Sequence, residues 1–441
     1  MSSKVWFFLA AITLPLMGAL AQIQPPGVPF RSPVTTASGF SASVIFSNLT
    51  TPRGIAFDST GNTLLVVERG FGVTALSPSS SSPGSWERST VVQNTGFTHG
   101  IQIEGSSLYV STGAAVLVYE YNSQTKTVAQ NQAPLTLISG LPADGELTTH
   151  TLQLEKNEHG DTTALYVGSG PLTNIDTTAR DPASGRSQVR RFLLPSSATQ
   201  QWSSGEVIAF GIRNPAGLAF DPSTSTRNLY IVENGASIDN VTGLTADFVN
   251  DNPADEMELV AFTSSESSTP FYGFPDCTTL WNPEADPVGN PEFINLPRGT
   301  QFSLRLDPSR DDEWCQDEEN NIKPALSFQA HSVPLDIKFY KAPSGAGSGS
   351  FPSSSLGNAF ISFHGSFDRD PPTGYGVVQV PFPLTGTPSS GLGYDFLVQA
   401  TNLNTCPGTC IRPVGLAFGI DGKLYVSSDS SGEIFVIQTS T

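Results

Sequence analysis

Short strands joined by polar turns dominate the pattern of hydrophobic and polar positions along this chain. Six segments repeat one form: an apolar triplet, a polar turn with Asp, Gly or Asn, and an alternating strand that ends near Gly or Ser. Alternation with period two around turn residues predicts a β-hairpin for each segment. The segments are RGIAFDSTGNTLLVVERG from Arg53, HGIQIEGSSLYVSTG from His99, HTLQLEKNEHGDTTALYVGSG from His150, AGLAFDPSTSTRNLYIVENG from Ala216, VPLDIKFY with GNAFISFHG from Val333, and VGLAFGIDGKLYVSSD from Val414.

Six repeated hairpins predict an all-β fold, namely a six-bladed β-propeller of four-stranded antiparallel blades. The alternative is some other all-β fold with alternating strands. We expect residues 22–441 to form this one domain. The long insertion from Ser237 to Lys323 should form loops on the face that carries function.

The start of the chain has the pattern of a secretory signal peptide over residues 1–21. A lysine precedes an apolar run from Val5, and Ala19-Leu20-Ala21 stands before Gln22. We therefore expect a secreted, extracellular protein that begins near Gln22. The formal net charge of −18 argues against nucleic acid or an anionic membrane as partners.

The four cysteines and two sequons are also consistent with secretion. In a secreted chain four cysteines favour two disulfides over a metal site. The short spacing of Cys406 and Cys410 favours that pair, which leaves Cys277 with Cys315. Asn48 in NLT and Asn240 in NVT are candidate glycosylation sites.

Large polar side chains recur at one position of the repeat. Because this position is the entry of an inner strand, these side chains should converge at the mouth of the central channel. A ring of arginines inside an acidic chain with only 22 basic residues favours a small polyanion as ligand. The alternative is that each arginine caps a strand or pairs with an acid across a blade. The residues at or near this position are Arg53, His99, His150, Arg213, Asn214 and Arg412, with Arg369 close to His364.

The sequence lacks the motifs of several common enzyme classes and contains one strongly acidic segment. The chain contains no GxSxG, HExxH, GxGxxG or GxxxxGK sequence, so serine hydrolase, zincin, Rossmann and P-loop chemistry have no local support. Carboxylates are concentrated in DNPADEMELV, from Asp251 to Val260, which is either a solvated loop or a loop stabilised by Ca²⁺.

Taken in order, several motifs resemble the soluble glucose/sorbosone dehydrogenases. The resemblance is closer to the secreted fungal pyranose dehydrogenase domains that use pyrroloquinoline quinone (PQQ), and it covers nearly the whole chain after residue 21. The motifs are GIRNPAGLAFDP, LYIVENG, DEMELV, YGFPDC, HSVPLDIKFY, FHGSFDRDPPTGYGVVQVPF and RPVGLAFGIDGKLYVSSD.

This resemblance implies a six-bladed propeller that carries PQQ across the channel mouth with Ca²⁺ at one edge. It implies hydride transfer from C1 of a pyranose sugar to the quinone, with His150 as general base and Ca²⁺ and Arg213 stabilising the developing oxyanion. The calcium site would use the backbone carbonyls of Gly235 and Ala236. The implied cofactor contacts are Arg53, His99, Arg213, Asn214, His331, His364, Arg369 and Arg412.

The partners implied are a sugar and a separate diffusible electron acceptor, such as a small quinone or an extracellular redox protein. We also expect a monomer. Two motifs depart from the family pattern, namely GSFDR with Phe367 and Asp368, and GYGVV with Gly376. The first departure, Asp368, places a carboxylate near the expected site of an anionic cofactor. The alternatives are a calcium-dependent propeller lactonase and a non-enzymatic carbohydrate-binding propeller.

Two histidines lie nine residues apart in the third segment, and repeat position separates them. His150 stands at the head of an inner strand and should point toward the channel mouth. His159 belongs to the turn NEHGD, where a solvated loop histidine is expected.

Overall fold

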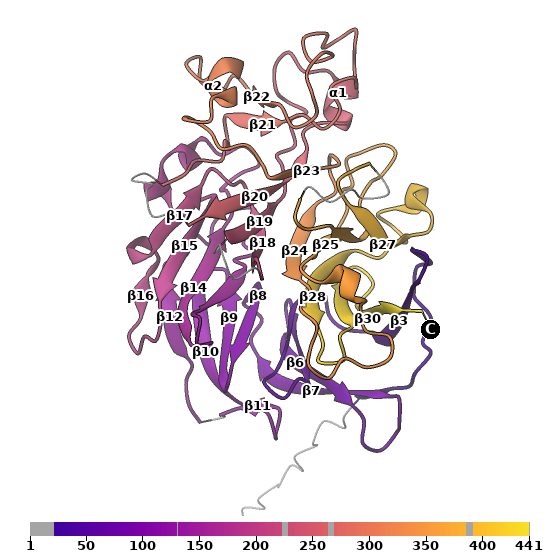
Figure 1. Ribbon diagram of the computed structural model, residues 1–441. Helices are drawn as coiled ribbons and strands as arrows, with labels where there is room; N and C mark the ends of the chain where they lie inside the picture. The colour runs from indigo at the N-terminus through magenta and orange to yellow at the C-terminus, as the bar shows by residue number, and fades with distance from the viewer. Residues whose placement is uncertain (1–21, 130, 223–227, 263–268, 385–390, 441) are drawn as a thin grey trace, which may run out of the picture.

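The computed structural model describes residues 22–129, 131–222, 228–262, 269–384 and 391–440, and the expected signal peptide lies outside them. Six small antiparallel sheets are arranged as blades around one axis (Figure 1). The first three blades follow the chain order. Blade 1 contains β4 (Pro52–Phe57), β5 (Leu64–Glu68), β6 (Gly72–Pro78) and β7 (Trp86–Gln93), with β1 (Gln22–Gln24) outside; blade 2 contains β8 (Phe97–Glu104), β9 (Ser107–Thr112), β10 (Ala115–Asn122) and β12 (Leu135–Ser139), with β11 (Thr127–Val128) and β16 (Gln200–Gln201) added; blade 3 contains β13 (Leu152–Lys156), β14 (Thr162–Ser169), β15 (Gln188–Leu193) and β17 (Glu206–Phe210).

The other three blades continue the ring and close it. Blade 4 contains β18 (Pro215–Phe220), β19 (Asn228–Glu233), β20 (Asp255–Ala261) and β23 (Leu326–Phe328); blade 5 contains β24 (Pro334–Phe339), β25 (Ala359–Phe363), β26 (Gly376–Val380) and β27 (Asp395–Ala400), with β2 (Val34–Thr36) outside; blade 6 contains β28 (Pro413–Phe418), β29 (Leu424–Ser428), β30 (Glu433–Thr439) and β3 (Phe40–Phe46). Strand β3 comes from the start of the chain, so blade 6 joins both ends of the described sequence.

The innermost strands show that the ring is complete. Each of the six is the first strand of its hairpin, and β4, β8, β13, β18, β24 and β28 contact one another in this order and back to β4. The six repeated segments therefore form the inner hairpins of six blades. The six-bladed all-β propeller predicted from the sequence is confirmed.

Glycine in the repeat allows these inner strands to lie close together. A Cβ at Gly54 would lie 2.1 Å from the carbonyl oxygen of His99, and one at Gly415 would lie 2.5 Å from that of Arg53. Such distances are far below van der Waals contact, so no other residue fits without moving a strand. These contacts place Gly54 beside His99 of blade 2 and Gly415 beside Arg53 of blade 1.

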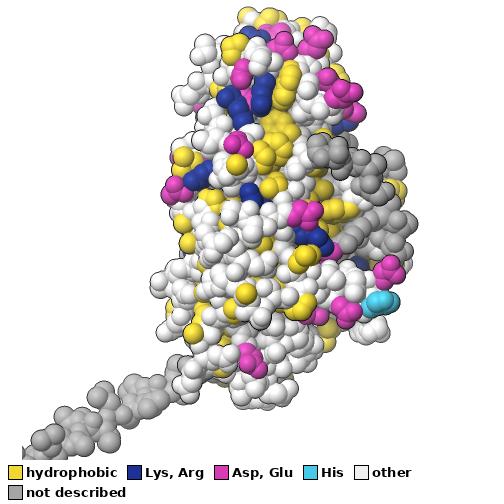
Figure 2. All heavy atoms as spheres, turned by 90° about the vertical axis from the view of Figure 1, so that its left-hand side faces the viewer, with side chains coloured by type: hydrophobic (Ala, Val, Ile, Leu, Met, Phe, Trp, Pro, Cys, Tyr) yellow, Lys and Arg dark blue, Asp and Glu magenta, His cyan; other side chains and the backbone are white. Residues whose placement is uncertain are grey.

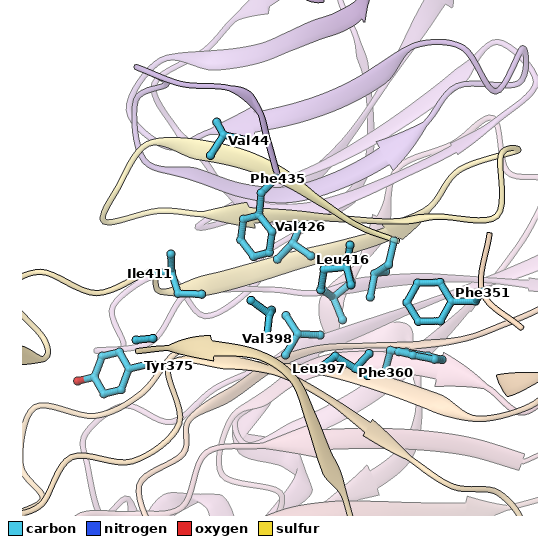
Figure 3. Close-up of a cluster of buried hydrophobic side chains, with 14 of the residues drawn as sticks. Val44, Phe351, Phe360, Tyr375, Leu397, Val398, Ile411, Leu416, Val426 and Phe435 are labelled. Atoms are coloured by element: carbon cyan, nitrogen blue, oxygen red, sulfur yellow. The ribbon is translucent and has the colours of Figure 1, made fainter. Parts of the chain in front are cut away.

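Hydrophobic side chains fill the spaces between neighbouring blades. Figure 3 shows the cluster between blades 5 and 6, where side chains of Phe360 and Val398 meet those of Leu416, Val426 and Phe435. All five are buried. Burial of apolar surface on both faces of each sheet supplies most of the stability that holds the ring rigid around its axis.

The insertion between blade 4 strands β20 and β23 forms a separate layer above the ring (Figure 1). It contains the two-stranded sheet β21 (Cys277–Thr279) and β22 (Gln301–Ser303) and the helix α2 (Asp312–Gln316), and helix α1 (Ala246–Asn250) precedes β20. In Figure 2 many of the charged side chains on one side of the molecule gather in this upper part. A disulfide joins Cys277 to Cys315 within it, and a second joins Cys406 to Cys410, which are the two expected pairs.

The described helices are short. Among the residues that the structure describes, no helix has the length and apolar character needed to cross a membrane.

Candidate functional site

One carboxylate, Asp429, binds two basic side chains at the inner ends of the blades. Its Oδ2 accepts a 2.6 Å hydrogen bond from Arg53 Nη1, and its Oδ1 lies 2.9 Å from His364 Nε2. Asp429 follows strand β29, Arg53 lies in β4 and His364 follows β25, so the contact joins blades 6, 1 and 5. Burial alone would raise the pKa of Asp429, but the bonds and charges of His364 and Arg53 lower it strongly. Asp429 is therefore ionised.

Two buried nitrogen atoms of this cluster lack partners. Arg53 Nε and His99 Nδ1 have no hydrogen-bond partner among the described residues, although both side chains are buried. Burial and the charge of Arg53 hold the pKa of His99 well below its usual value, so the ring is neutral. Buried polar atoms without partners cost free energy, so a ligand or water that reached them would be favoured.

Arg412 continues the cluster toward blade 5. Its Nε donates to the carbonyl oxygen of His364 at 3.1 Å, and its Nη2 donates to that of Gly365. Its guanidinium also lies over the Tyr375 ring, 5.8 Å from the centroid. Arg53, Arg412, His99 and His364 thus gather at one end of the ring, and Asp429 binds two of them, Arg53 and His364.

Arg213 forms a second centre where blade 3 meets blade 4. Its Nε donates to Asn174 O at 2.9 Å and its Nη2 to Asn174 Oδ1 at 3.0 Å. Its Nη1 donates to the carbonyl oxygens of Asn234 and Gly235 at 3.2 and 3.1 Å. The side chain therefore clamps the loop after β14 to the turn after β19, which is the turn expected to hold calcium.

Amide and carboxylate side chains also hold the turn after β19 in place. Asn214 Nδ2 donates to Asn234 Oδ1 at 2.7 Å, and Asn234 Nδ2 donates to Pro334 O at 2.6 Å. Asp255 accepts from the backbone N–H groups of Gly235 at 2.8 Å and Val333 at 2.6 Å. Asn214 therefore positions the turn from inside the protein.

Three buried glutamates lie next to the same turn. One carboxylate oxygen of each residue, Glu233, Glu256 and Glu258, lies within 4.8 Å of the corresponding oxygens of the other two. Burial and mutual repulsion raise the pKa of Glu233 and of Glu258 well above the usual value. Beside them a cavity of about 10 Å³ is lined by Arg213, Glu233, Gly235, Ala236 and Glu256, among others. Close carboxylates next to backbone carbonyls are the oxygen donors that Ca²⁺ prefers, so this region could hold such a cation.

His150 contacts the backbone of two neighbouring blades. Its Nδ1 lies 3.0 Å from Gly168 O in blade 3 and its Nε2 lies 3.1 Å from Gly113 O in blade 2. The side chain is buried between the two blades, and the backbone has a φ of +43°. The role of His150 as a general base at the channel mouth stays a prediction. His159 is exposed in the turn, as expected.

The loop with the unusual GSFDR sequence carries its own ion pairs. Asp368 Oδ1 lies 3.4 Å from His331 Nδ1, and His331 Nε2 lies 3.1 Å from Val249 O. Burial would lower the pKa of His331, but these two contacts outweigh it and raise it. Arg369 pairs with Asp251 and donates to Pro371 O. The carboxylate of Asp368 is therefore balanced by His331, and Arg369 is already engaged.

Two residues of the site, Asp429 and Asn174, were missed from the sequence. The position of Asp429 could have been predicted from the sequence. In an antiparallel hairpin the end of the second strand lies beside the start of the first, and β28 and β29 pair Pro413 with Ser428. The acid that ends LYVSSD therefore had to lie near Arg412 and the other basic residues of the ring.

Comparison with known proteins places this architecture in a family. The sequence profile of the TrAA12-like family matches residues 34–440. The chain belongs to the TrAA12-like family. A "Pyrroloquinoline quinone-dependent sugar dehydrogenase" of Hypocrea jecorina is 33% identical, with 94% of this chain and 91% of the relative covered. The "Pyrroloquinoline quinone-dependent pyranose dehydrogenase" of Coprinopsis cinerea is also 33% identical over 94% of this chain, which spans 56% of that longer protein.

Solved structures agree with this TrAA12-like assignment. The iodide structure of the Trichoderma reesei family AA12 enzyme has a TM-score of 0.80 at 32% identity, with 94% of this chain and 99% of that chain covered. The holo form of the Coprinopsis cinerea pyranose dehydrogenase PQQ domain has a TM-score of 0.77 at 30% identity, covering 94% and 99%. The soluble aldose sugar dehydrogenase of Escherichia coli, at 16% identity and a TM-score of 0.56, shares the fold, with 91% and 100% covered.

Proposed function

We propose that this chain is a PQQ-dependent dehydrogenase that oxidises C1 of pyranose sugars, either aldoses or 2-keto-aldoses. One observation carries the proposal: Arg53, Arg412, His99 and His364 converge on one end of the ring in a chain of net charge −18. The guanidinium groups of Arg53 and Arg412 outnumber the one carboxylate of Asp429, and this net positive charge inside an acidic protein suits a small polyanion such as PQQ, which is a tricarboxylate. The names of the two relatives with 33% identity support the same cofactor.

The residues present fit PQQ. Arg53 Nε and His99 Nδ1 are buried and have no hydrogen-bond partner among the residues that the structure describes, so both atoms are available to a ligand. The group would be held by the Asp429 cluster on one side and by the Arg213 centre on the other, and when bound it supplies the quinone that accepts a hydride. Among the remaining predicted contacts, Asn214 acts by holding the turn, and His331 and Arg369 border the site through their pairs with Asp368 and Asp251.

The residues present also fit Ca²⁺. Gly235 and Ala236 line the same small cavity as Glu233 and Glu256, so backbone carbonyls and carboxylates are available together. The ion would polarise the oxygen of a bound quinone. Arg213, which is held against the Gly235 carbonyl, contributes a fixed positive charge at the same place.

The chain's own residues must also take the hydroxyl proton of the sugar. The family resemblance assigns this step to His150. For His150 to accept a proton, Nε2 would have to leave the Gly113 carbonyl and reach the site. A His150→Ala variant tests that assignment by its turnover at saturating cofactor.

The proposal includes a separate diffusible electron acceptor, a monomer and an extracellular location. Both sequon residues, Asn48 and Asn240, are exposed, as glycosylation requires. The two disulfides fit an oxidising compartment.

One experiment tests the function against its alternatives. Purified protein is incubated with PQQ and Ca²⁺, a panel of aldoses and 2-keto-aldoses is added, and reduction of an artificial dye is followed. The proposal expects sugar-dependent and PQQ-dependent reduction. Lactone hydrolysis without dye reduction would favour the calcium-dependent lactonase, and sugar binding without either reaction would favour the binding propeller.

A further inference from the structure

We propose that the substrate ring stacks on the side chain of Phe367, and that the neighbouring carboxylate of Asp368 accepts a hydroxyl group of the same sugar. The proposal rests on the sugar oxidation proposed above and names the residues that select the substrate. It starts from one exposed ring. Phe367 is 79% exposed, whereas the next most exposed phenylalanine of the described residues, Phe262, is 38% exposed. A single exposed apolar side chain is common on protein surfaces, so the place and rigidity of this one carry the inference.

The backbone that leads into Phe367 is fixed to the core of blade 5. Gly365 N–H donates to Ser332 O at 2.9 Å, and the hydroxyl of Tyr375 donates to Ser366 O. Tyr375 is fully buried, and a Cβ at Gly365 would lie 2.4 Å from its ring, so this ring packs directly against the loop. The chain therefore reaches Phe367 in one fixed conformation.

The backbone that follows Phe367 is tied to the insertion at the end of helix α1. Asn250 Nδ2 donates to Asp370 O at 2.7 Å, and Asp370 N–H donates to Asn250 Oδ1 at 2.8 Å. Arg369 pairs with Asp251 next to them. With both sides anchored, the Phe367 ring is presented to solvent on a rigid loop, so little conformational freedom is lost when a ligand covers it.

The same loop links the two arginine centres of the site. Before Phe367, the carbonyl oxygen of Gly365 accepts from Arg412 Nη2. After it, Asp368 acts on the other centre: burial lowers the pKa of Arg213, and nearby carboxylates, Asp368 among them, raise it. Phe367 therefore lies on the surface between the two groups that are proposed to hold PQQ. A sugar reaches its ring directly from solvent.

Asp368 supplies a hydrogen-bond acceptor beside the ring. Its side chain is 31% exposed and its Oδ1 lies 3.4 Å from His331 Nδ1. The contact with His331 lowers the pKa of Asp368, so the carboxylate is ionised and can only accept. Within the described part of the chain, no side chain other than His331 pairs with this carboxylate. It is therefore open to a hydroxyl donor of a ligand.

A pyranose ring offers both kinds of group. Its C–H groups can lie flat on an aromatic ring and bury apolar area, and its hydroxyl groups can donate to a carboxylate at the edge. The pair therefore selects pyranoses whose C–H groups gather on one face. An axial hydroxyl on that face would hold the sugar away from the Phe367 ring.

Steady-state kinetics at saturating PQQ test the stacking. Phe367→Ala should raise the KM for pyranose substrates by about 10-fold and leave kcat within about threefold, because it removes binding that substrate and transition state share. Phe367→Leu keeps an apolar side chain without a planar face, so it should resemble Phe367→Ala, whereas Phe367→Trp should keep the wild-type KM. The Kd for PQQ and the midpoint of urea unfolding should be unchanged in all three variants, because the ring is exposed.

The carboxylate has its own pair of variants. Asp368→Asn keeps an acceptor oxygen, so it should raise KM less than Asp368→Ala does. The control for an exposed apolar side chain is Leu193→Ala. Leu193 is 62% exposed and pairs with Ala164, whereas Ser187, just before the other end of β15, donates to Arg213 O. Leu193→Ala should keep the wild-type KM.

Two kinetic results would overturn the proposal. One is a KM for Phe367→Ala within about threefold of the wild-type value. The other is an equal rise in the Kd for PQQ, which would make Phe367 a contact of the cofactor and not of the sugar.

A second readout needs no turnover. A 1,5-anhydro pyranose has the sugar ring but lacks the C1 hydroxyl, so it binds without being oxidised. In saturation-transfer NMR, its C–H face should gain more from irradiation at aromatic than at aliphatic protein frequencies, and this difference should vanish in Phe367→Leu. Its persistence in Phe367→Leu would overturn the stacking. A wild type that shows the difference but oxidises no sugar would defeat the proposed function alone, and one that oxidises sugar without the difference would defeat the stacking alone.

Discussion

The clamp formed by Arg213 can be weakened without removing its charge. Arg213→Lys keeps one cation but cannot form the fork that reaches Asn174 O, Asn174 Oδ1, Asn234 O and Gly235 O together. A lysine can keep about two of these four hydrogen bonds. Because hydrogen bonds to a charged donor contribute about 1.5 kcal/mol or more each, the variant should lose about 3 kcal/mol at this place.

This loss should appear in cofactor affinity. The clamp joins the loop at Asn174 to the turn at Gly235 and Ala236, where PQQ and Ca²⁺ are proposed to bind. If the turn must be held in place before binding, 3 kcal/mol corresponds to an increase of about 100-fold in the Kd for PQQ. The measurement is a PQQ titration at fixed Ca²⁺, followed by quenching of protein fluorescence.

A matched control separates binding from stability. Arg190 is also a buried arginine, and it donates to Gln188 Oε1, Trp202 O, Gly205 O and Pro182 O within blade 3 and its adjoining loops. Arg190→Lys should cost a similar amount of stability in urea unfolding and leave PQQ affinity unchanged. The reasoning would be refuted if the Kd of Arg213→Lys for PQQ stayed within about threefold of the wild-type value. It would also be refuted if Arg190→Lys lost as much PQQ affinity as Arg213→Lys.

Three further outcomes are expected. Burial raises the pKa of Glu258 well above its unfolded value, so the folded state holds an extra proton and the free energy of unfolding falls as pH rises above about 4.3. Glu258→Gln should reduce this dependence on pH by up to about 1.4 kcal/mol per pH unit, measured by urea unfolding in the presence of chelator, and an unchanged dependence would contradict the prediction. Gly54→Ala should lower the free energy of unfolding by about 3 kcal/mol or more, because its Cβ would lie 2.1 Å from His99 O, whereas Gly345→Ala, with open space around it, should change it by less than about 0.5 kcal/mol. Removal of Ca²⁺ with chelator should abolish dye reduction and its return should restore it; turnover that persists in chelator would exclude a role for the ion.

The fold was predictable because it rests on a local pattern. Each inner hairpin follows from alternation around a turn, and the turn glycines Gly61 and Gly160 have φ of +71° and +85°, as their sequence positions indicated. The strand pairing that closes blade 6 was harder to predict from the sequence. Strand β3 pairs with β30 over nearly the full length of the chain, with Phe40 opposite Thr439, and no repeat marks such a partner.

The site was predictable in position but less so in direction. Repeat register correctly placed Arg53, His99 and Arg412 at the same end of the ring. It gave no sign of the positive φ of His150, +43°, or of the contacts of its ring with Gly168 O and Gly113 O, because neither follows from the alternation of polar and apolar residues. The partner of Arg369 likewise comes from the distant Asp251, so an isolated strand pattern gives no sign of it.

The most direct test of the account is a single turnover in the absence of oxygen. Protein loaded with one equivalent of PQQ in the presence of Ca²⁺ is mixed with sugar, and the absorbance of the bound quinone is followed without any dye. The account predicts that the quinone is reduced by one equivalent of sugar, with one equivalent of lactone formed. A bound quinone that stays oxidised with every pyranose tried would contradict it.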